Sequence, residues 1–345
     1  MFMKKLAIYF IILSLIIIPG CSKKTSNPEP VQKTSNQNTT EVEKNEIMPN
    51  EFYEMMQGDE RPVAVMIDND TAAARPQIGL ESAYMVYEII VEGGSSRMMA
   101  LFKKHDIEKV GPVRSSRHYF LDYALEHDAI YCHAGWSPKA QADIRSLGVN
   151  NINGIQGDDG SIYWRDYTYD RTWHNLYTGV DKLFEKAKND KNYRTTTDTK
   201  HTQYLTTETD LEEGEDTTNI TLPYSNNYKV TYEYDSENKV YKRFVNGGAH
   251  MSQTDEQLTA KNIIIYQIYN FNLPDNDNVG RQDLKNIGSG TGYYVTNGKM
   301  IEINWEKTSR EGRTVYTTTD GEELLLNPGN TFVQIIPQAS TITLS

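Results

Sequence analysis

Short apolar runs separated by turn-forming residues constrain the fold of this chain more than any other feature. Residues 63–67, 84–91, 98–103 and 129–132 are four to eight residues long and lie between turn signals such as Pro62, Asp68, Gly93-Gly94 and Asp128. Runs of that length and setting are typical of buried strands. Residues 116–127, 138–147 and 180–189 instead carry apolar positions three and four apart, with Ser, Pro or Asp near their starts, which predicts helices. We therefore expect an N-terminal α/β domain with a mixed sheet.

The second half of the chain is predicted to be β-rich. Residues 228–234 and 240–245 alternate around a short polar turn, and residues 293–296 and 300–305 flank the dipeptide Asn297-Gly298. Asn-Gly between alternating runs is a strong hairpin signal. Apolar periodicity lapses from 193 to 219, so we place a domain boundary there. The prediction is an α/β domain at 59–200 and a smaller β-rich domain at 201–345, α+β overall.

The N-terminus has the pattern of an export signal. Two lysines precede the apolar run 6–18, which is shorter than the roughly 20 residues that a membrane-spanning helix needs. The run ends in Pro19-Gly20-Cys21, which resembles a bacterial lipobox. This resemblance implies cleavage of residues 1–20 and acylation of Cys21 with chains such as palmitate, and two chains suffice for stable anchoring. We expect an extracytoplasmic protein on the outer face of the cytoplasmic membrane. The alternative is a cleaved secretory signal followed by an ordinary cysteine.

Residues 21–58 read as a flexible tether after the acylated cysteine. They are mostly Ser, Thr, Asn, Lys, Glu and Pro, and the first aromatic residue after Cys21 is Phe52. Such a composition buries too little apolar area to offset the entropy of ordering. The formal net charge of −12 disfavours nucleic acid as a partner. Any anionic ligand must then be held by a local cluster of positive charges.

Such a cluster surrounds a turn and a helix start between residues 93 and 122. Arg97 opens an alternating apolar run, and Arg114 and Arg117 follow the Gly111-Pro112 turn. Ser115 or Ser116 is placed to cap the following helix. Guanidinium groups beside a helix N-terminus favour a phosphate or carboxylate. A purely structural set of ion pairs is equally open, since carboxylates are available at Asp68, Asp70, Glu88, Glu92 and Asp122.

Four motifs carry a resemblance to a known family. They are VGPVRSSR at 110–117, YCHAGWSP at 131–138, HNLYT at 174–178 and NGGAH at 246–250. Together they resemble the YerB family of bacterial lipoproteins over essentially the whole mature chain. The resemblance implies a two-domain lipoprotein on the surface of Gram-positive bacteria and supplies no mechanism.

A second resemblance concerns residues 98–102 and 111–115. They are similar to the strand, turn and Pro-Arg-Asp arrangement of LytR-CpsA-Psr phosphotransferases, whose arginines grip a polyprenyl pyrophosphate. That likeness implies that Arg171 joins the cluster and that Asp166 or Asp170 orients a magnesium ion or an acceptor hydroxyl. The sequence departs from the pattern, because Ser115 replaces the acid and a valine precedes the arginine. A pyrophosphate-binding site is therefore favoured over a working transferase.

Other catalytic patterns are weak. The chain has no G-x-S-x-G element, and Cys132 and His133 are adjacent on a strand, so they point to opposite faces and a core cysteine is favoured. No two histidines have the i, i+4 spacing of a zinc helix, and whether a metal binds is left open. His118 and His174 are kept as possible catalytic residues.

Two functional classes follow from these observations. The favoured one is a noncatalytic binding module of the cell envelope without a cofactor, with a wall precursor or a wall-synthesis protein as a possible partner. Its anion site consists of Arg97, Arg114, Ser115, Ser116, Arg117 and Arg171. The alternative is a magnesium-dependent phosphotransferase that acts on a polyprenyl-pyrophosphate-linked glycan and uses Asp166, Asp170, His118 or His174.

Overall fold

The structure is a computed structural model that describes residues 50–199, 202–274 and 279–345. The predicted signal peptide, Cys21 and all but the last residues of the predicted tether lie outside the described residues. The α-helices in the described part are α1 (Glu51–Gln57), α2 (His118–Glu126), α3 (Pro138–Ser146) and α4 (Val180–Glu185), which continues as a π-helical turn, Lys186–Asp190. No helix in these ranges is long and apolar enough to cross a membrane.

A mixed eleven-stranded sheet forms the centre of the described fold. In spatial order its strands are β19 (Val315–Thr318), β18 (Lys299–Lys307), β17 (Gly288–Thr296), β14 (Asn262–Ile268), β20 (Thr331–Pro337), β2 (Met85–Ile90), β3 (Ser96–Phe102), β1 (Val63–Ile67), β4 (Ile130–His133) and β5 (Asn151–Asn153), with β8 (Glu215–Asp216) beside β18. The pairs β1–β4, β4–β5, β14–β20 and β2–β20 are parallel, and the other pairings are antiparallel. This confirms the predicted mixed sheet.

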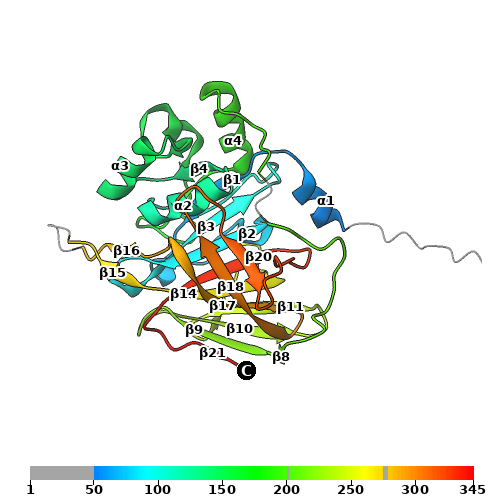
Figure 1. Ribbon diagram of the computed structural model, residues 1–345. Helices are drawn as coiled ribbons and strands as arrows, with labels where there is room; N and C mark the ends of the chain where they lie inside the picture. The colour runs from blue at the N-terminus through cyan, green and yellow to red at the C-terminus, as the bar shows by residue number, and fades with distance from the viewer. Residues whose placement is uncertain (1–49, 200–201, 275–278) are drawn as a thin grey trace, which may run out of the picture. The chain divides into compact units, whose positions relative to one another are not determined.

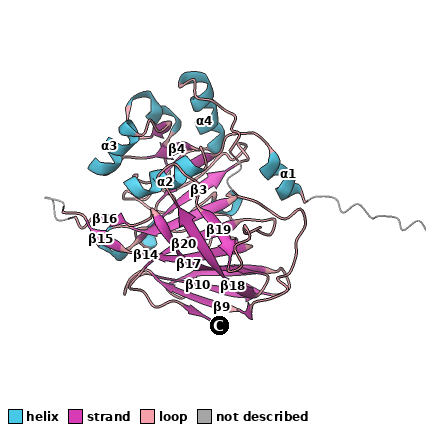
Figure 2. Ribbon diagram, in the orientation of Figure 1, coloured by secondary structure: helices cyan, strands magenta, loops and turns pink. Residues whose placement is uncertain are grey.

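The β-rich character of the second half is confirmed by a separate six-stranded sheet. It consists of β12 (Gly248–Ala249), β11 (Val240–Val245), β10 (Lys229–Asp235), β9 (Asn219–Pro223) and β21 (Thr343–Leu344), with β13 (Thr259–Ala260) beside β11. Two short ribbons complete the described strands: β6 (Trp164–Arg165) with β7 (Leu176–Tyr177), and β15 (Asn270–Asn272) with β16 (Gln282–Leu284). Figures 1 and 2 show helices α3 and α4 at the end of the described fold opposite the six-stranded sheet, and α2 nearer the central strands.

Burial explains why the strands differ in sequence pattern. Every residue of Val63–Ile67 is buried, because the central strands are covered on both faces and therefore read as continuous apolar runs. In β10, Val230 and Tyr232 are buried while Lys229 and Glu233 are exposed, which gives the alternation seen in the sequence. The predicted hairpin at Asn297-Gly298 is confirmed, since both residues have positive φ between β17 and β18.

The central sheet takes strands from both sides of the predicted boundary at residue 200. Strand β20, near the C-terminus, pairs with β14 through Thr331–Pro337 and with β2 of the N-terminal half through its first residues. Each half thus supplies hydrogen-bond partners to the other. That the two halves are separate domains stays a prediction. The shared sheet indicates that each half stabilises the other.

Helix α1 lies at residues that we predicted, from their composition, to be the end of the tether. Asn50 caps it by accepting a hydrogen bond from the Phe52 backbone, and Met56 is buried in the core. The Phe52 ring packs edge-on against Tyr204, 5.1 Å between centroids. A cap and two apolar contacts offset the entropy of ordering this last stretch.

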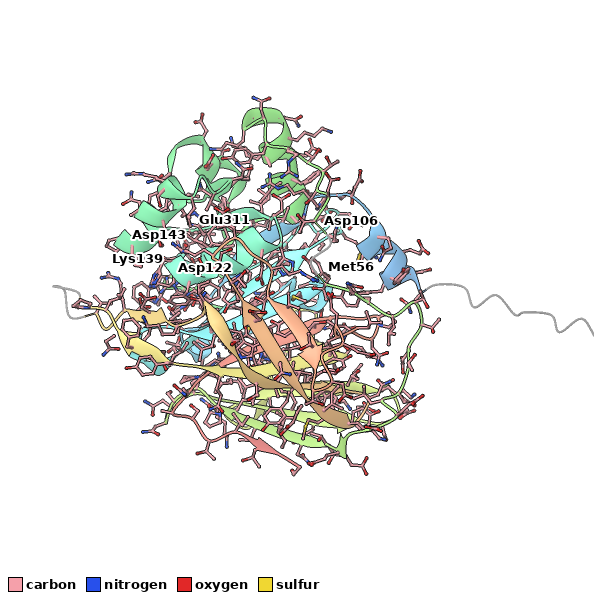
Figure 3. The ribbon with its side chains drawn as sticks, viewed as in Figure 1. Met56, Asp106, Asp122, Lys139, Asp143 and Glu311 are labelled. Atoms are coloured by element: carbon pink, nitrogen blue, oxygen red, sulfur yellow. The ribbon has the colours of Figure 1, made fainter. Side chains whose placement is uncertain are left out.

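Charged side chains also join the two halves. The helices α2 and α3 present Asp122 and Asp143, labelled in Figure 3, and Arg310 from the loop after β18 donates to both, at 2.6 and 2.8 Å. Lys307 at the end of β18 is buried against Glu126 of α2 at 2.6 Å. These contacts hold the end of β18 and the loop that follows it against helices α2 and α3.

Candidate functional site

A pocket of about 460 Å³ lies where the predicted arginine cluster meets the loop before β7. The turn after β1, the end of β2, strand β3 and the segment before α2 all contribute to it. Its lining residues are Asp70, Thr71, Glu92, Gly93, Ser95, Arg97, Arg114, Ser115, Arg117, Trp173, His174 and Val279. The structure therefore brings Arg97, Arg114, Ser115, Arg117 and His174 together.

Asp70 is the carboxylate that two of the arginines share. Nη2 of Arg97 donates to both of its oxygens, at 2.8 and 3.0 Å, and Nε and Nη2 of Arg114 donate to Oδ2 at 3.2 and 3.1 Å. Burial acts to raise the pKa of Asp70, but these two arginines outweigh it and hold the pKa below its usual value. Asp70 is thus an anion within the site.

Arg97 is the most deeply placed of the three arginines. It lies on β3, is only 2% exposed, and its Nη1 donates to the Ser115 carbonyl at 2.8 Å. Its Nε–H has no hydrogen-bond acceptor among the described residues. Burial opposes its charge, yet Asp70 and Asp68 raise the pKa of Arg97, so the guanidinium stays charged.

Arg114 and Arg117 lie nearer the mouth of the pocket. Arg114 is 22% exposed, and its guanidinium carbon lies 5.2 Å from the centre of the Trp173 ring, a cation–π contact. Arg117 makes a forked pair with Glu92, with Nε to Oε1 at 2.6 Å and Nη2 to Oε2 at 2.9 Å. Every arginine of the cluster therefore has a carboxylate partner, as the structural alternative anticipated.

His174 adds an ionisable group to this balanced set. Its Nδ1 lies 2.7 Å from Oδ2 of Asp68, a fully buried carboxylate that also lies 3.3 Å from Nε of Arg114. The hydrogen bond with Asp68 raises the pKa of His174 above its ordinary value of 6.5, against the opposing effect of burial. Three arginines face three carboxylates here, so protonation of His174 decides whether the pocket carries a net positive charge.

The two serines do not cap helix α2, contrary to the prediction. The helix begins at His118 with Arg117 at the N-cap and no side-chain cap. Ser115 Oγ donates to the Ala134 carbonyl at 3.0 Å, and Ser116 Oγ accepts from the Tyr131 hydroxyl at 2.8 Å. Strand β4 and the residue that follows it thus engage both hydroxyls, and side chains rather than a helix N-terminus make up the pocket.

The remaining predicted site residues in the described ranges do not line the pocket. Ser116 is buried against Tyr131. His118 is paired with Asp283 at 2.7 Å between Nε2 and Oδ1, and burial lowers the pKa of His118. Arg171 is exposed on the loop between β6 and β7. Asp166 is bound to Lys109 at 2.7 Å and to Thr168.

Asp170 touches the pocket only indirectly. Its carboxylate accepts hydrogen bonds from the backbone and hydroxyl of Thr172 and from the backbone of His174. Burial would raise the pKa of Asp170, but these hydrogen bonds lower it overall. Asp170 therefore fixes the loop that carries His174. The sequence analysis considered Asp170 as a catalytic acid and did not predict this positioning role.

Sequence reasoning also missed Trp173, which follows Tyr167 and Tyr169 in a polar stretch. Aromatic residues without apolar neighbours at strand or helix spacing are typical of exposed rings, so the sequence did contain a signal for Trp173.

The predicted core cysteine is confirmed: Cys132 is fully buried, and burial raises the pKa of its thiol. His133 is bound to Gly135 and Asn151, and burial lowers its pKa to about 4. No metal-binding group of three or more His, Cys, Asp or Glu side chains is found in the described ranges.

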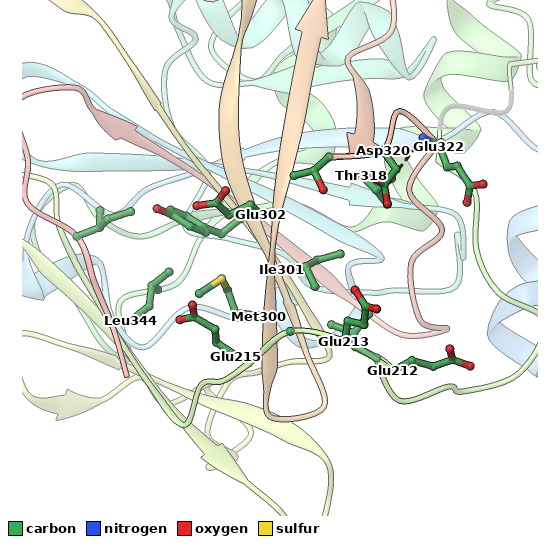
Figure 4. Close-up of a pocket in the computed structure, with 15 residues that line it drawn as sticks. Glu212, Glu213, Glu215, Met300, Ile301, Glu302, Thr318, Asp320, Glu322 and Leu344 are labelled. Carbon is green, nitrogen blue, oxygen red and sulfur yellow. Dashed lines mark hydrogen bonds between the residues drawn. The ribbon is translucent and has the colours of Figure 1, made fainter.

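A larger hollow of about 940 Å³ lies beside β18 and has the opposite character. Figure 4 shows Glu213, Glu215 and Glu302 around Met300 and Ile301, and further acidic residues line its rim. Like charges at this density repel an anion. The hollow is therefore no alternative seat for the predicted ligand.

Two family models match this chain. The "Protein of unknown function (DUF3048) N-terminal domain" matches residues 52–197, and the corresponding C-terminal domain matches residues 220–333. The chain belongs to the DUF3048 family. The first model contains Arg97, Arg114 and Arg117, and the second contains β10 to β19, most of β9 and the start of β20.

Relatives of this DUF3048 protein support the same assignment. This chain is 33% identical over 289 residues to the "Putative lipoprotein YerB" of Bacillus subtilis (strain 168). The matched region covers 83% of this chain and 84% of that protein. Its fold is similar to the crystal structure of the YerB protein from Bacillus subtilis, with a TM-score of 0.73, 32% identity, and coverage of 84% of this chain and 94% of that one. The resemblance to the YerB family is thereby confirmed.

Proposed function

We propose that this DUF3048 protein is an anchored lipoprotein of the Gram-positive cell envelope that acts as a noncatalytic binding module, and that the arginine pocket binds an anionic group. The name of its Bacillus subtilis relative supports the anchor, and Cys21 is the acylation site in this proposal. An acylated Cys21 would hold the described domains at the outer face of the cytoplasmic membrane.

The observation that carries the anion site is the convergence of Arg97, Arg114 and Arg117 with His174 on one pocket. Arg97 and Arg114 share the carboxylate of Asp70, and Arg117 is paired with Glu92. An anion in the pocket gains from Arg114 and Arg117, whose guanidinium groups have more donors than their carboxylate partners occupy.

A noncatalytic role is favoured by the contacts of the candidate acids. Asp166 is bound to Lys109 and Thr168, and Asp170 to Thr172 and the backbone of His174. Neither lines the pocket, so neither is positioned to orient a magnesium ion at a bound pyrophosphate. Turnover of a labelled polyprenyl-linked glycan in the presence of magnesium would overturn this part of the proposal and favour the phosphotransferase alternative.

Calorimetric titration with pyrophosphate tests the site. Arg114→Ala should weaken binding by roughly one to two powers of ten, since a hydrogen bond to a charged group is worth about 1.5 to 3 kcal/mol. Arg310→Ala is the matched control, because Arg310 is similarly exposed and also pairs with two carboxylates, yet lies outside the pocket. Wild-type protein that binds no anion, or equal losses in both variants, would contradict the site.

The anchor is tested separately with Cys21→Ser. The variant should lose labelling by palmitate and move from the membrane fraction to the medium, or accumulate as an uncleaved precursor. Labelling that is unchanged in this variant would remove the lipoprotein assignment without affecting the pocket.

A further inference from the structure

Three aromatic rings project into solvent from the loop between β6 and β7, beside the arginine pocket. Tyr167 is 54% exposed, Tyr169 47% and Trp173 64%. Large aromatic side chains normally bury most of their surface in a folded protein, so a cluster left exposed on one short loop marks a binding surface. None of the three rings belongs to the described hydrophobic core or packs against it.

The loop that carries them is held in shape by its own polar residues. Asp166 accepts from the backbone and the hydroxyl of Thr168, and Lys109 binds the same carboxylate. Asp170 fixes the next turn through Thr172, and Asn175 donates to the Asp170 carbonyl. Rings on a preorganised loop bind a ligand without first losing backbone freedom. Asp166 and Asp170 thus have a structural role in this loop.

Trp173 connects the aromatic loop to the charged pocket. It lines the pocket, the Arg114 guanidinium lies over its ring, and the ring of His174 meets it edge-on at 5.7 Å between centroids. A single ligand therefore contacts an apolar ring face and a cluster of cationic donors at once. The pocket volume of about 460 Å³ is that of a small-molecule site rather than a flat protein interface.

Hydroxyl groups complete the lining. Ser115 and Ser95 donate their protons to backbone carbonyls, and Thr71 accepts from the Ala73 backbone. Each hydroxyl oxygen has two lone pairs, so the oxygens of Ser115 and Ser95 keep acceptor capacity for hydroxyl groups of a ligand. Apolar ring faces, hydroxyl acceptors and guanidinium donors together match the C–H face, the hydroxyls and the charge of an acidic sugar.

We propose that the pocket and the aromatic loop bind a sugar that carries a phosphate or a carboxylate, with the sugar ring on Trp173 and the charge at Arg97, Arg114 and His174. This inference rests on the proposed anion site and names its ligand class. An acidic peptide is the competing occupant, and the pocket's hydroxyl lining and small volume favour the sugar.

Calorimetric titrations compare N-acetylglucosamine 1-phosphate, glucuronic acid, neutral N-acetylglucosamine and inorganic phosphate. The sugar phosphate or the sugar acid should bind roughly five to ten times more tightly than inorganic phosphate, which is the gain expected from one aromatic contact. Whichever of the two binds more tightly identifies phosphate or carboxylate as the charge. Neutral N-acetylglucosamine should bind far more weakly than either.

Variants separate the ring from the charge. Trp173→Ala should remove the preference for the sugar over inorganic phosphate, and Trp173→Phe should restore part of it. Tyr269→Ala is the control, since Tyr269 is also exposed but lies outside the pocket, and it should change nothing.

The possible failures are distinguishable. If wild-type protein binds inorganic phosphate and shows no preference for the sugar, the sugar proposal is wrong and the anion site stands. If Trp173→Ala weakens phosphate and sugar phosphate equally, the ring acts solely through Arg114 and the proposal is again wrong. A glutamate-rich peptide that binds as tightly as the sugar and depends on Trp173 would assign the surface to a protein partner. If no anion binds at all, both proposals fail.

Discussion

Replacing Arg243 by methionine tests how the two halves of the fold are held together. Arg243 on β11 and Glu88 on β2 are both fully buried, and Nη2 donates to Oε2 at 2.8 Å. Arg243 also donates to Nδ1 of His250 at 3.0 Å and to the Tyr232 hydroxyl at 2.7 Å. Burial opposes the charge of Arg243, but Glu88 and Tyr232 outweigh it and raise the pKa of Arg243, so the charge is compensated within the core.

The expected loss follows from leaving Glu88 without its cation. Breaking a buried pair by removing one partner costs about 3 to 5 kcal/mol, because the remaining charge is buried and uncompensated. Methionine fills most of the volume of arginine, so a cavity adds little. Ser96 and Tyr228 still donate to Oε1 of Glu88, both at 2.6 Å, which places the loss toward the lower end of that range. The melting temperature should fall by about 10 °C.

Urea unfolding followed by circular dichroism measures this loss. Arg194→Ala is the control, because the Arg194–Asp128 pair is exposed at the arginine and should contribute less than about 1 kcal/mol. The double variant Glu88→Gln/Arg243→Met should be more stable than Arg243→Met alone, since the stranded charge is gone. A loss in Arg243→Met no larger than that in Arg194→Ala would refute the reasoning.

Three further outcomes are expected. In a Cys21→Ser background, the Cys132 thiol should react with a thiol reagent only after denaturation, since burial raises its pKa; rapid labelling of native protein would contradict this. A single cut between residues 193 and 219 should leave two fragments that co-elute in native gel filtration, because β20 pairs with β2; separate native peaks would instead indicate independent domains. Sulfate binding, measured by calorimetry at constant ionic strength, should be strongest below about pH 6.5 and should be lost as the pH rises through the raised pKa of His174. The His174→Gln variant should show a flattened pH profile.

Much of the fold could be predicted because local sequence and burial agree. The apolar run Val63–Ile67 and the Asn297-Gly298 hairpin form where the sequence indicates, since covered strands are uniformly apolar and a two-residue turn needs positive φ. The place of β20 between β14 and β2 was not predictable. Its partners lie far away in the chain, and no local pattern specifies which edge a buried apolar strand will join.

The site was predictable in its residue types and not in its pairings. The arginines at 97, 114 and 117 converge as expected, but the choice of Asp70 for two of them and of Glu92 for the third depends on tertiary geometry. The same reason explains the error at Ser116. A Ser-Ser-Arg sequence before a helix favours a cap, and Tyr131, a residue of β4, engages that hydroxyl instead.

Three consecutive residues after β1 connect the pocket to the buried pair between the halves. Asp70 lines the pocket and pairs with Arg97 and Arg114, and the fully buried Asp68 holds His174 and Arg114 from behind. Asn69, between them, points the other way: its side-chain amide donates to Ser96, Tyr228 and Glu88, beside Arg243. Because a side chain on one residue fixes the backbone of its neighbours, the network around Glu88 and Arg243 sets the positions of Asp70 in the pocket lining and of Asp68 behind it. The β-rich half therefore supports the pocket although nearly all of the pocket's lining comes from the other half, which gives a physical reason for both halves to occur in one sheet.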